Sequence, residues 1–312
     1  MRIPFKLPAN REFDAVGFGL NAVDHLIVAP EYPAFDTKVR FTEYEKSAGG
    51  QTASAMVALQ RLGLKTAYAG RFGSDEDGRF GLSSLEYEGV NLDYAEMIDG
   101  ADNQIAFIII DARSGERTII WDRDERLSYR LDEAPIELAT RGRVLHIDAH
   151  DPPACAAMAR AARADGIVVT SDIDNIYEGL PELLPLIDVL ITSAELPHRL
   201  TGISDERASL VEMKARHGCG VVGVTLGARG ALVYCAGEFV ESRAFAVPGG
   251  CRDTTGAGDA FHGGFIYGML RGEDVETCMK LGNAVAALKC RSLGGRAALP
   301  TADELAEFVS AN

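Results

Sequence analysis

Short apolar runs recur along the chain, first with the spacing of strands and later as strands and helices in alternation. Residues 13–19 predict a strand, because Ala15, Val16 and Phe18 are apolar. Further expected elements are strands at 144–148, 167–170, 189–192, 220–225 and 231–235, and helices at 152–164, 275–290 and 301–308. The alternation from Arg143 onward predicts an α/β fold in which a doubly wound, mostly parallel sheet lies between two helical layers. We expect one such three-layer domain over residues 1–312.

A β-hairpin interrupts this alternation. In 104–111 the apolar residues Ile105, Phe107 and Ile109 alternate, the sequence Ala-Arg-Ser-Gly supplies a turn, and 116–121 returns as a second strand. Residues 37–46 alternate less regularly and predict one or two exposed strands. These segments together predict a small sheet separate from the main one. Its apolar face needs a partner, which favours a homodimer.

A glycine-rich loop that opens a helix, Asp253-Thr-Thr-Gly-Ala-Gly-Asp-Ala-Phe261, carries the strongest chemical signal. Gly256, Ala257 and Gly258 have almost no side chain, so an anion can approach their backbone N–H groups. The helix dipole adds positive potential at the same end. Asp259, in the first turn, either complements the dipole or acts as a general base on a hydroxyl that attacks phosphorus.

Composition narrows the partners and the compartment. The chain is 47% hydrophobic and 25% charged, as expected of a globular protein, and its net charge of −15 argues against a nucleic-acid surface. No run is long enough to span a membrane, and the N-terminal sequence MRIPFKLPANREF is too polar for a signal peptide. The six cysteines show no C-x-x-C pairing and are expected to be buried free thiols. We therefore expect a cytoplasmic protein.

Two stretches resemble the signatures of one enzyme family. The sequence DTTGAGDAFHGGF at 253–265 resembles the C-terminal signature of the PfkB, or ribokinase-like, carbohydrate kinases. GGQTASAMVALQRLG at 49–63 resembles their N-terminal signature, although Ser54 replaces the usual Asn and Met56 replaces a small residue. AALKCRSLGGRAALP at 286–300 is similar to ketose- and sulfosugar-type members. The resemblance covers about 13–308 and implies transfer of the γ-phosphoryl group of ATP, with Mg²⁺, to a primary hydroxyl of a carbohydrate.

The resemblance also implies roles for individual residues. Asp259 is then the catalytic base, and Gly256, Ala257 and Gly258 form an anion hole. Asn21 and Asp24, polar residues at the expected end of the first strand, join the 49–54 loop in the sugar site. The sugar-binding set is Asn21, Asp24, Gly49, Gly50, Gln51, Ser54 and Arg123, the last toward an anionic group. The segments 34–47 and 101–123 form a lid over the sugar.

For the nucleotide, the sequence Thr225-x-Gly227-x-x-Gly230 resembles the family's phosphate-lining turn, although an ordinary glycine-rich hairpin turn has the same pattern. Asn283 and Ala287, on a helix of small residues, are expected to seat the adenine. Asp253 is a candidate ligand of a monovalent cation such as K⁺, as in some relatives. Glu195 is a candidate contributor to Mg²⁺ through water.

Alternatives remain for the function and for one cluster. A nucleoside kinase has the same fold and lid, and a non-catalytic sugar-binding regulator could retain the fold. Hydroxymethylpyrimidine-type kinases are disfavoured, because those relatives lack the lid. In 146–151 the residues His146, Asp148 and His150 share one face of an extended segment, which cannot close around one ion without a bend. We interpret this cluster as a polar strand end rather than a zinc site.

Overall fold

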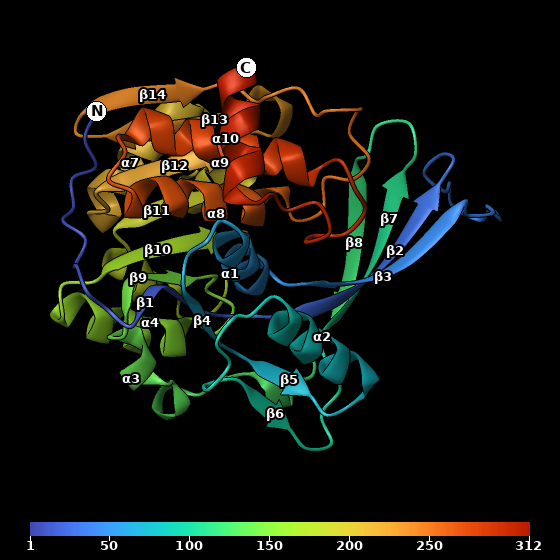
Figure 1. The fold of residues 1–312 in the computed structure, drawn as a ribbon, viewed down its shortest axis with the longest axis horizontal. Coiled ribbons are helices and arrows are strands. Elements are labelled where there is room, and N and C mark those ends of the chain that lie inside the picture. Colours follow the sequence, from blue (N-terminus) through green and yellow to red (C-terminus); the bar gives the residue numbers. More distant parts are fainter.

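An eight-stranded sheet forms the centre of the molecule, in a computed structural model that describes residues 1–312 (Figure 1). The strands lie in the order β14-β13-β12-β11-β10-β9-β1-β4. Those from β12 to β4 are parallel, and β13 and β14 complete the edge in antiparallel pairs. Their bounds are β1 (Phe13–Phe18), β4 (Thr66–Ala69), β9 (Gly142–Ile147), β10 (Val168–Ile173), β11 (Val189–Ser193), β12 (Val221–Thr225), β13 (Ala231–Cys235) and β14 (Glu238–Ser242). The mostly parallel sheet is the architecture expected from the sequence.

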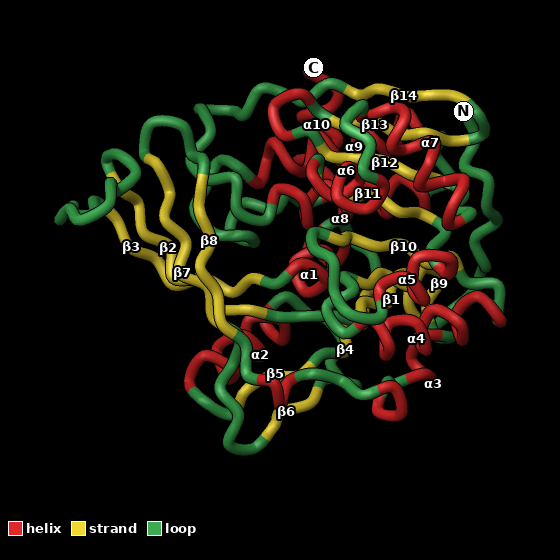
Figure 2. The backbone as a smooth tube through the Cα atoms, turned by 180° about the vertical axis from the view of Figure 1, so that it is seen from behind, coloured by secondary structure: helices red, strands yellow, loops and turns green.

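Helices cover both faces of this sheet, as Figures 1 and 2 show from opposite sides. One face carries α1 (Gln51–Arg61), α8 (Ala257–Leu270), α9 (Val275–Lys289) and α10 (Ala302–Ala311). The other carries α3 (Ile136–Ala139), α4 (Pro152–Ala164), α5 (Leu180–Leu183), α6 (Glu195–Thr201) and α7 (Glu206–His217). Along β11, Leu190 joins the second core, whereas Val189 and Ile191 join the first. Alternate side chains of a strand point to opposite faces, so a central strand that is apolar throughout fills both cores.

A four-stranded sheet projects from one side of the body (Figure 1). It has the order β3-β2-β7-β8, with β2 (Ala22–Ala29), β3 (Glu43–Gly49), β7 (Ile105–Asp111) and β8 (Arg117–Asp122). The helix α2 (Glu76–Tyr87) packs against β2, β3 and β5 (Arg71–Gly73), and β5 pairs with β6 (Glu96–Ile98). The predicted hairpin is thus confirmed as β7 and β8.

The sequence-based assignment of residues 19–46 was wrong in two respects. Residues 34–42 form no strand, and the strand in this region is β3, which begins at Glu43. Residues 22–29 form β2, which pairs with β3 and β7, so Asp24 lies inside a strand of the second sheet and not at the end of β1. Pro30 and Pro33 follow the strand and do not interrupt it.

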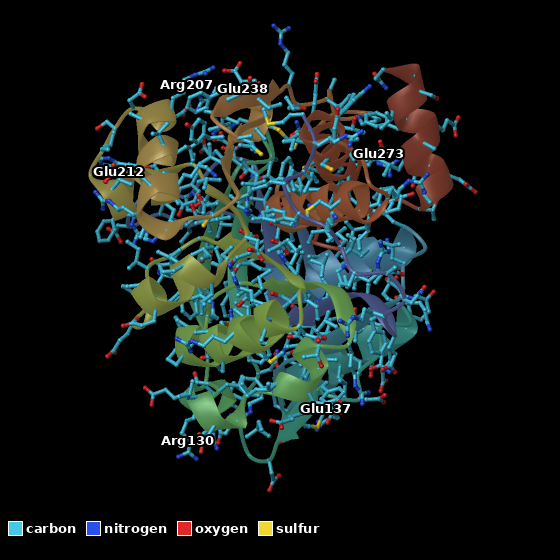
Figure 3. All side chains as sticks on the ribbon, turned by 90° about the vertical axis from the view of Figure 1, so that its left-hand side faces the viewer. Arg130, Glu137, Arg207, Glu212, Glu238 and Glu273 are labelled. Atoms are coloured by element: carbon cyan, nitrogen blue, oxygen red, sulfur yellow. The ribbon has the colours of Figure 1, made fainter.

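The outer surface is polar, and Figure 3 shows charged side chains around the periphery of the body, among them Arg130, Glu212 and Glu273. None of the helices combines the length and the apolar character needed to cross a bilayer. Five of the six cysteines are buried free thiols, as expected, but Cys251 is exposed.

Candidate active site

A cavity of about 1200 Å³ lies between the second sheet and the carboxyl ends of the parallel strands. The main sheet contributes side chains that follow or end β10, β11 and β12, namely Asp172, Asp174, Ser193 and Thr225. The second sheet contributes Asp24, Ala106, Ile108, Arg117, Ile119 and Trp121. Ligands of open α/β folds bind at this edge of the sheet. The cavity is therefore the candidate active site.

The amino end of α8 forms part of the cavity wall. Its N-cap, Gly256, has a positive φ of 73°, and a Cβ there would lie 2.7 Å from Gly295 Cα. Only glycine accommodates both the left-handed backbone and this close approach. The amide of Ala257 donates to Thr254 O at 3.1 Å, whereas no protein group accepts from the amides of Gly256 and Gly258. These unpartnered N–H groups at a helix amino terminus can bind an anion.

Asp259 follows directly in the first turn of α8 and lines the cavity. Burial raises the pKa of Asp259 well above its usual range, the negative charge of Asp172 raises it further, and Arg117 opposes them. A carboxylate with a raised pKa is a stronger base than an exposed one and is poised to accept a proton. The site therefore places unpartnered helix amides beside a carboxylate whose pKa is raised.

His262 stabilises the ionised carboxylate of Asp172, at the end of β10. Oδ1 of Asp172 lies 3.4 Å from His262 Nε2. Burial alone would raise the pKa of Asp172, but His262 and the neighbouring Gln51 favour the carboxylate, and the net effect is a lowered pKa. Asp172 and Asp259 thus have opposite pKa shifts, as expected for one fixed negative charge beside one proton acceptor.

In the cluster at 146–151, His146 and Asp148 bind neighbouring protein groups. His146 is fully buried and its Nδ1 lies 2.9 Å from Thr170 Oγ1, and burial lowers the pKa of His146 to about 3. Asp148 accepts from Leu20 N at 2.7 Å and Thr52 Oγ1 at 2.9 Å. No three or more side chains of His, Cys, Asp or Glu come together here as a preformed metal site. Only His150 of the three faces the cavity.

Among the expected sugar ligands, Asp24, Gly50 and Gln51 line the cavity. Asp24, Ala106 and Trp121 are register partners across β2, β7 and β8, so their side chains share the inner face of the second sheet. Burial raises the pKa of Asp24 to about 7, although Arg296 lowers it. Gly49 does not line the cavity, but a Cβ there would collide with the Asp24 carboxylate.

Three other expected sugar ligands do not line the cavity. Asn21 is buried and donates from Nδ2 to Arg71 O at 2.6 Å. Arg123 forms an ion pair with Asp151 at 3.0 Å and donates to Leu127 O. Asp151 therefore compensates the positive charge of Arg123. Ser54 is buried and accepts from the Nε of Arg296 at 3.2 Å. The structure thus gives these side chains partners within the scaffold.

Two arginines near the cavity, Arg117 and Arg296, were not predicted from the sequence. Arg296 is buried and also donates to Gly49 O and Ser84 Oγ, and burial lowers its pKa to about 10. Arg117, on β8, lines the cavity and donates to Thr254 Oγ1 at 2.8 Å. A buried arginine in a glycine-rich loop and an arginine after a hairpin turn look like surface residues, and only the register and the fold reveal their partners.

All five expected nucleotide residues line the other end of the cavity, namely Thr225, Gly227, Gly230, Asn283 and Ala287. Gly227 and Gly230 have positive φ angles of 57° and 93°. The Nδ2 of Asn283 donates to Ser242 O at 3.1 Å and Arg243 O at 3.2 Å, and so holds the segment after β14 against α9. The side chain therefore shapes this wall of the cavity.

The two expected metal ligands lie outside the cavity lining. Glu195 begins α6 and is exposed. Asp253 is fully buried, and its carboxylate oxygens accept from Thr255 N and Gly294 N, both at 2.8 Å. The ammonium of Lys289 lies 3.8 Å from Asp253 Oδ2 and donates to Asp253 O at 2.9 Å. A positive charge already stands against these oxygens, so the surroundings of Asp253 do not fit an additional monovalent cation.

Comparison with known proteins agrees with this geometry. The model of the "pfkB family carbohydrate kinase" matches residues 15–302. An uncharacterised sugar kinase of Archaeoglobus fulgidus is 31% identical over 78% of this chain and 98% of its own. A ribokinase of Haemophilus influenzae is 28% identical, covering 92% and 95%, and a nucleoside kinase of Methanothermobacter thermautotrophicus is 25% identical, covering 96% of each.

Among solved structures, a candidate ribokinase from Agrobacterium tumefaciens superposes with a TM-score of 0.87 at 29% identity, over 96% of this chain and 98% of that one. The three-layer fold is therefore that of the ribokinases. The family model spans the main sheet, the second sheet and the loop that begins α8. The chain belongs to the PfkB family of carbohydrate kinases and is a phosphotransferase with an alcohol group as acceptor.

Proposed function

We propose that the protein is an ATP-dependent sugar kinase that phosphorylates a primary hydroxyl of a carbohydrate, with Asp259 as the general base. One observation carries this proposal: a carboxylate with a raised pKa lines the cavity directly beside the unpartnered amides of Gly256 and Gly258. A base and an anion site so close together suit attack of an alcohol on a phosphoryl group.

The reaction follows from these positions. Asp259 accepts the proton of the substrate hydroxyl as its oxygen forms a bond to the γ-phosphorus, and the bond from that phosphorus to the β-γ bridging oxygen of ATP breaks. The amides of Gly256 and Gly258 donate to the phosphoryl oxygens, on which negative charge is held in the transition state. The products are ADP, the phosphorylated sugar and a protonated Asp259.

The two ends of the cavity suit two different ligands. Asp24, Gln51 and Trp121 offer a carboxylate, an amide and an aromatic face, which suit the hydroxyls and apolar face of a sugar. Thr225, Gly227 and Gly230, followed by the small residues of α9, suit the phosphates and base of ATP. The reactive ends of both ligands then meet at Asp259.

Kinases of this family use ATP with Mg²⁺. The lining of the cavity fits this requirement, because its five carboxylates (Asp24, Glu116, Asp172, Asp174 and Asp259) face a single cationic side chain, Arg117. Such an acidic cavity repels a bare triphosphate. When bound, Mg²⁺ supplies charge neutralisation of the phosphates. Asp172 and Asp174 are the carboxylates that we assign to it, whereas Glu195 is exposed and lies outside the cavity lining.

We further propose that the four-stranded sheet acts as a lid and as a dimer surface. Asp24 and Trp121, on the inner face of the sheet, line the cavity. Closure of the sheet over the bound sugar would therefore exclude water from the reaction. On its outer face, Phe107 and Ile120 are cross-strand partners that are 45% and 58% exposed. Exposed apolar residues of this size on a sheet face favour burial against a second copy.

A nucleoside kinase is the second candidate, since a relative with 25% identity over nearly the full chain is a nucleoside kinase. A screen of ADP release with pentoses, hexoses, sugar phosphates, sulfosugars and nucleosides separates the two. We expect turnover with a carbohydrate, and preferential turnover of a nucleoside would replace this assignment. Ligand binding without any turnover would indicate a non-catalytic sugar-binding regulator.

A further inference from the structure

A fully buried ion pair lies beneath the loop that begins α8. Lys289 is the last residue of α9, and neither its side chain nor that of Asp253 has any solvent exposure. The ammonium of Lys289 donates to Asp253 O at 2.9 Å and lies 3.8 Å from Asp253 Oδ2. Burial of both charges is expensive unless the two compensate each other, so the arrangement requires an explanation.

The partners of Asp253 show what the pair supports. Asp253 Oδ1 accepts from Thr255 N, in the loop that leads into α8, and Oδ2 accepts from Gly294 N, in the loop that follows α9. These loops approach each other so closely that a Cβ at Gly256 would touch Gly295. The carboxylate therefore joins the two loops directly below the unpartnered amides of Gly256 and Gly258.

Asp253 is the residue for which the family resemblance implied a monovalent cation. Such an ion would be held by a carboxylate and carbonyl oxygens, and here those oxygens of Asp253 face the ammonium of Lys289. An ammonium carries the same single positive charge as K⁺ and offers three hydrogen-bond donors. A second cation placed against the same oxygens would be repelled by this ammonium, and the repulsion is poorly screened because the pair is fully buried.

We propose that the side chain of Lys289 takes the place of a monovalent cation in this protein. Lys289 is a positioning residue: it fixes Asp253, and through Asp253 the backbone of Thr255 and Gly256 that forms the anion site. The proposal makes catalysis independent of K⁺, because the positive charge is part of the chain. The inference rests on the proposed kinase function only in those experiments that measure activity.

The test compares the wild type with Lys289→Ala in KCl and in choline chloride of equal ionic strength. Two readouts are measured, the kcat and KM with ATP and the thermal unfolding midpoint without substrate. We expect the wild type to differ by less than twofold in kcat and to show the same midpoint in both salts. In choline the variant should lose at least tenfold in kcat and unfold at a lower temperature, because Asp253 is left as an unpaired buried charge. K⁺ should raise the kcat of the variant at least fivefold over its value in choline chloride and raise its unfolding midpoint.

Lys214→Ala is the matched control. Lys214 also donates to two backbone carbonyls, Cys219 O at 2.7 Å and Gly220 O at 3.0 Å, but it lies on α7 and does not line the cavity. Its removal should lower the midpoint equally in both salts. A response of this control to K⁺ would attribute the rescue to a general salt effect and overturn the proposal.

Two further results would overturn the proposal. One is activation or stabilisation of the wild type by K⁺, by more than fivefold in kcat or by a clear rise of the midpoint. The other is a folded Lys289→Ala protein that does not respond to K⁺. If the variant does not fold, the wild-type comparison decides. If no sugar or nucleoside is turned over, the unfolding midpoints and the affinity for ATP still test the inference, so its failure is distinct from that of the kinase assignment.

Discussion

Arg117 of the second sheet donates from Nη1 to Thr254 Oγ1 at 2.8 Å, in the loop that begins α8. The contact joins residues 137 positions apart in the sequence. Thr254 in turn donates from its backbone N and from Oγ1 to Gly115 O, in the turn before β8. The β7–β8 hairpin is thus attached to the anion site, and the charge of Arg117 acts on Asp259 and Asp24, whose pKa values it lowers.

Arg117→Gln removes this positive charge from the cavity. Burial and Asp172 then raise the pKa of Asp259 without opposition from Arg117, so the acid limb of the kcat/KM profile should move to higher pH. A charge interaction of about 1 kcal/mol predicts a loss of about fivefold at acid pH, and this loss should shrink at high salt. The matched control is Arg113→Gln, in the same hairpin but paired with Asp111. An unchanged pH profile of Arg117→Gln would contradict the assigned role.

Asp24→Asn should make the protein more stable at alkaline pH and a poorer catalyst. Burial raises the pKa of Asp24 in the folded protein from 3.8 to about 7, so between these values the folded state holds a proton that the unfolded state has released. The contribution of Asp24 to the free energy of unfolding therefore falls as pH rises from about 4 to 7, by at most about 4 kcal/mol.

Chemical denaturation at pH 4 and pH 8 measures this effect. We expect Asp24→Asn to be about 1–3 kcal/mol more stable than the wild type at pH 8 and equally stable at pH 4. Its KM for the sugar should rise about tenfold, because the carboxylate that we propose as a sugar ligand is replaced by an amide, which has only one acceptor oxygen. A variant that is less stable than the wild type at pH 8 would show that the ionised Asp24 is not costly.

Ser54 and Gln51 lie three residues apart on α1 and should respond differently to truncation. Ser54→Ala removes an acceptor from the buried Arg296, so we expect a loss of about 1–3 kcal/mol in stability and a sugar KM within twofold of the wild type. Gln51→Ala truncates a side chain that lines the cavity beside Asp172, so its sugar KM should rise about tenfold with little change in stability. The reverse pattern would restore Ser54 as a sugar ligand.

The sequence predicted those elements whose signals are local. The helix α4 begins at Pro152 and ends before Gly166, and both residues mark helix ends without help from the rest of the fold. The β7–β8 hairpin is likewise encoded by alternation around one turn. The strand β2 was missed because its parallel partner β7 is distant in sequence and its other partner, β3, follows only after a segment without regular structure.

The candidate site divides in the same way. The motif at 253–259 predicted a glycine-rich loop that opens a helix, and the structure has this loop at the start of α8, with Asp259 lining the cavity, because the signal is contained in consecutive residues. Ser54 lies within a signature yet binds Arg296, which is 242 positions away. The replacement of a cation by Lys289 was also hidden, since a lysine at the end of a helix normally reads as a surface residue that complements the dipole.

The role of Asp259 is tested most directly by the single-turnover rate and the ATP affinity of Asp259→Asn, with the sugar identified by the screen. The variant keeps the shape of the cavity and loses the proton acceptor. The account predicts a fall in the rate of phosphoryl transfer of about 10²–10⁴-fold with the dissociation constant for ATP within about threefold of the wild type. A rate within tenfold of the wild type would contradict general base catalysis by Asp259.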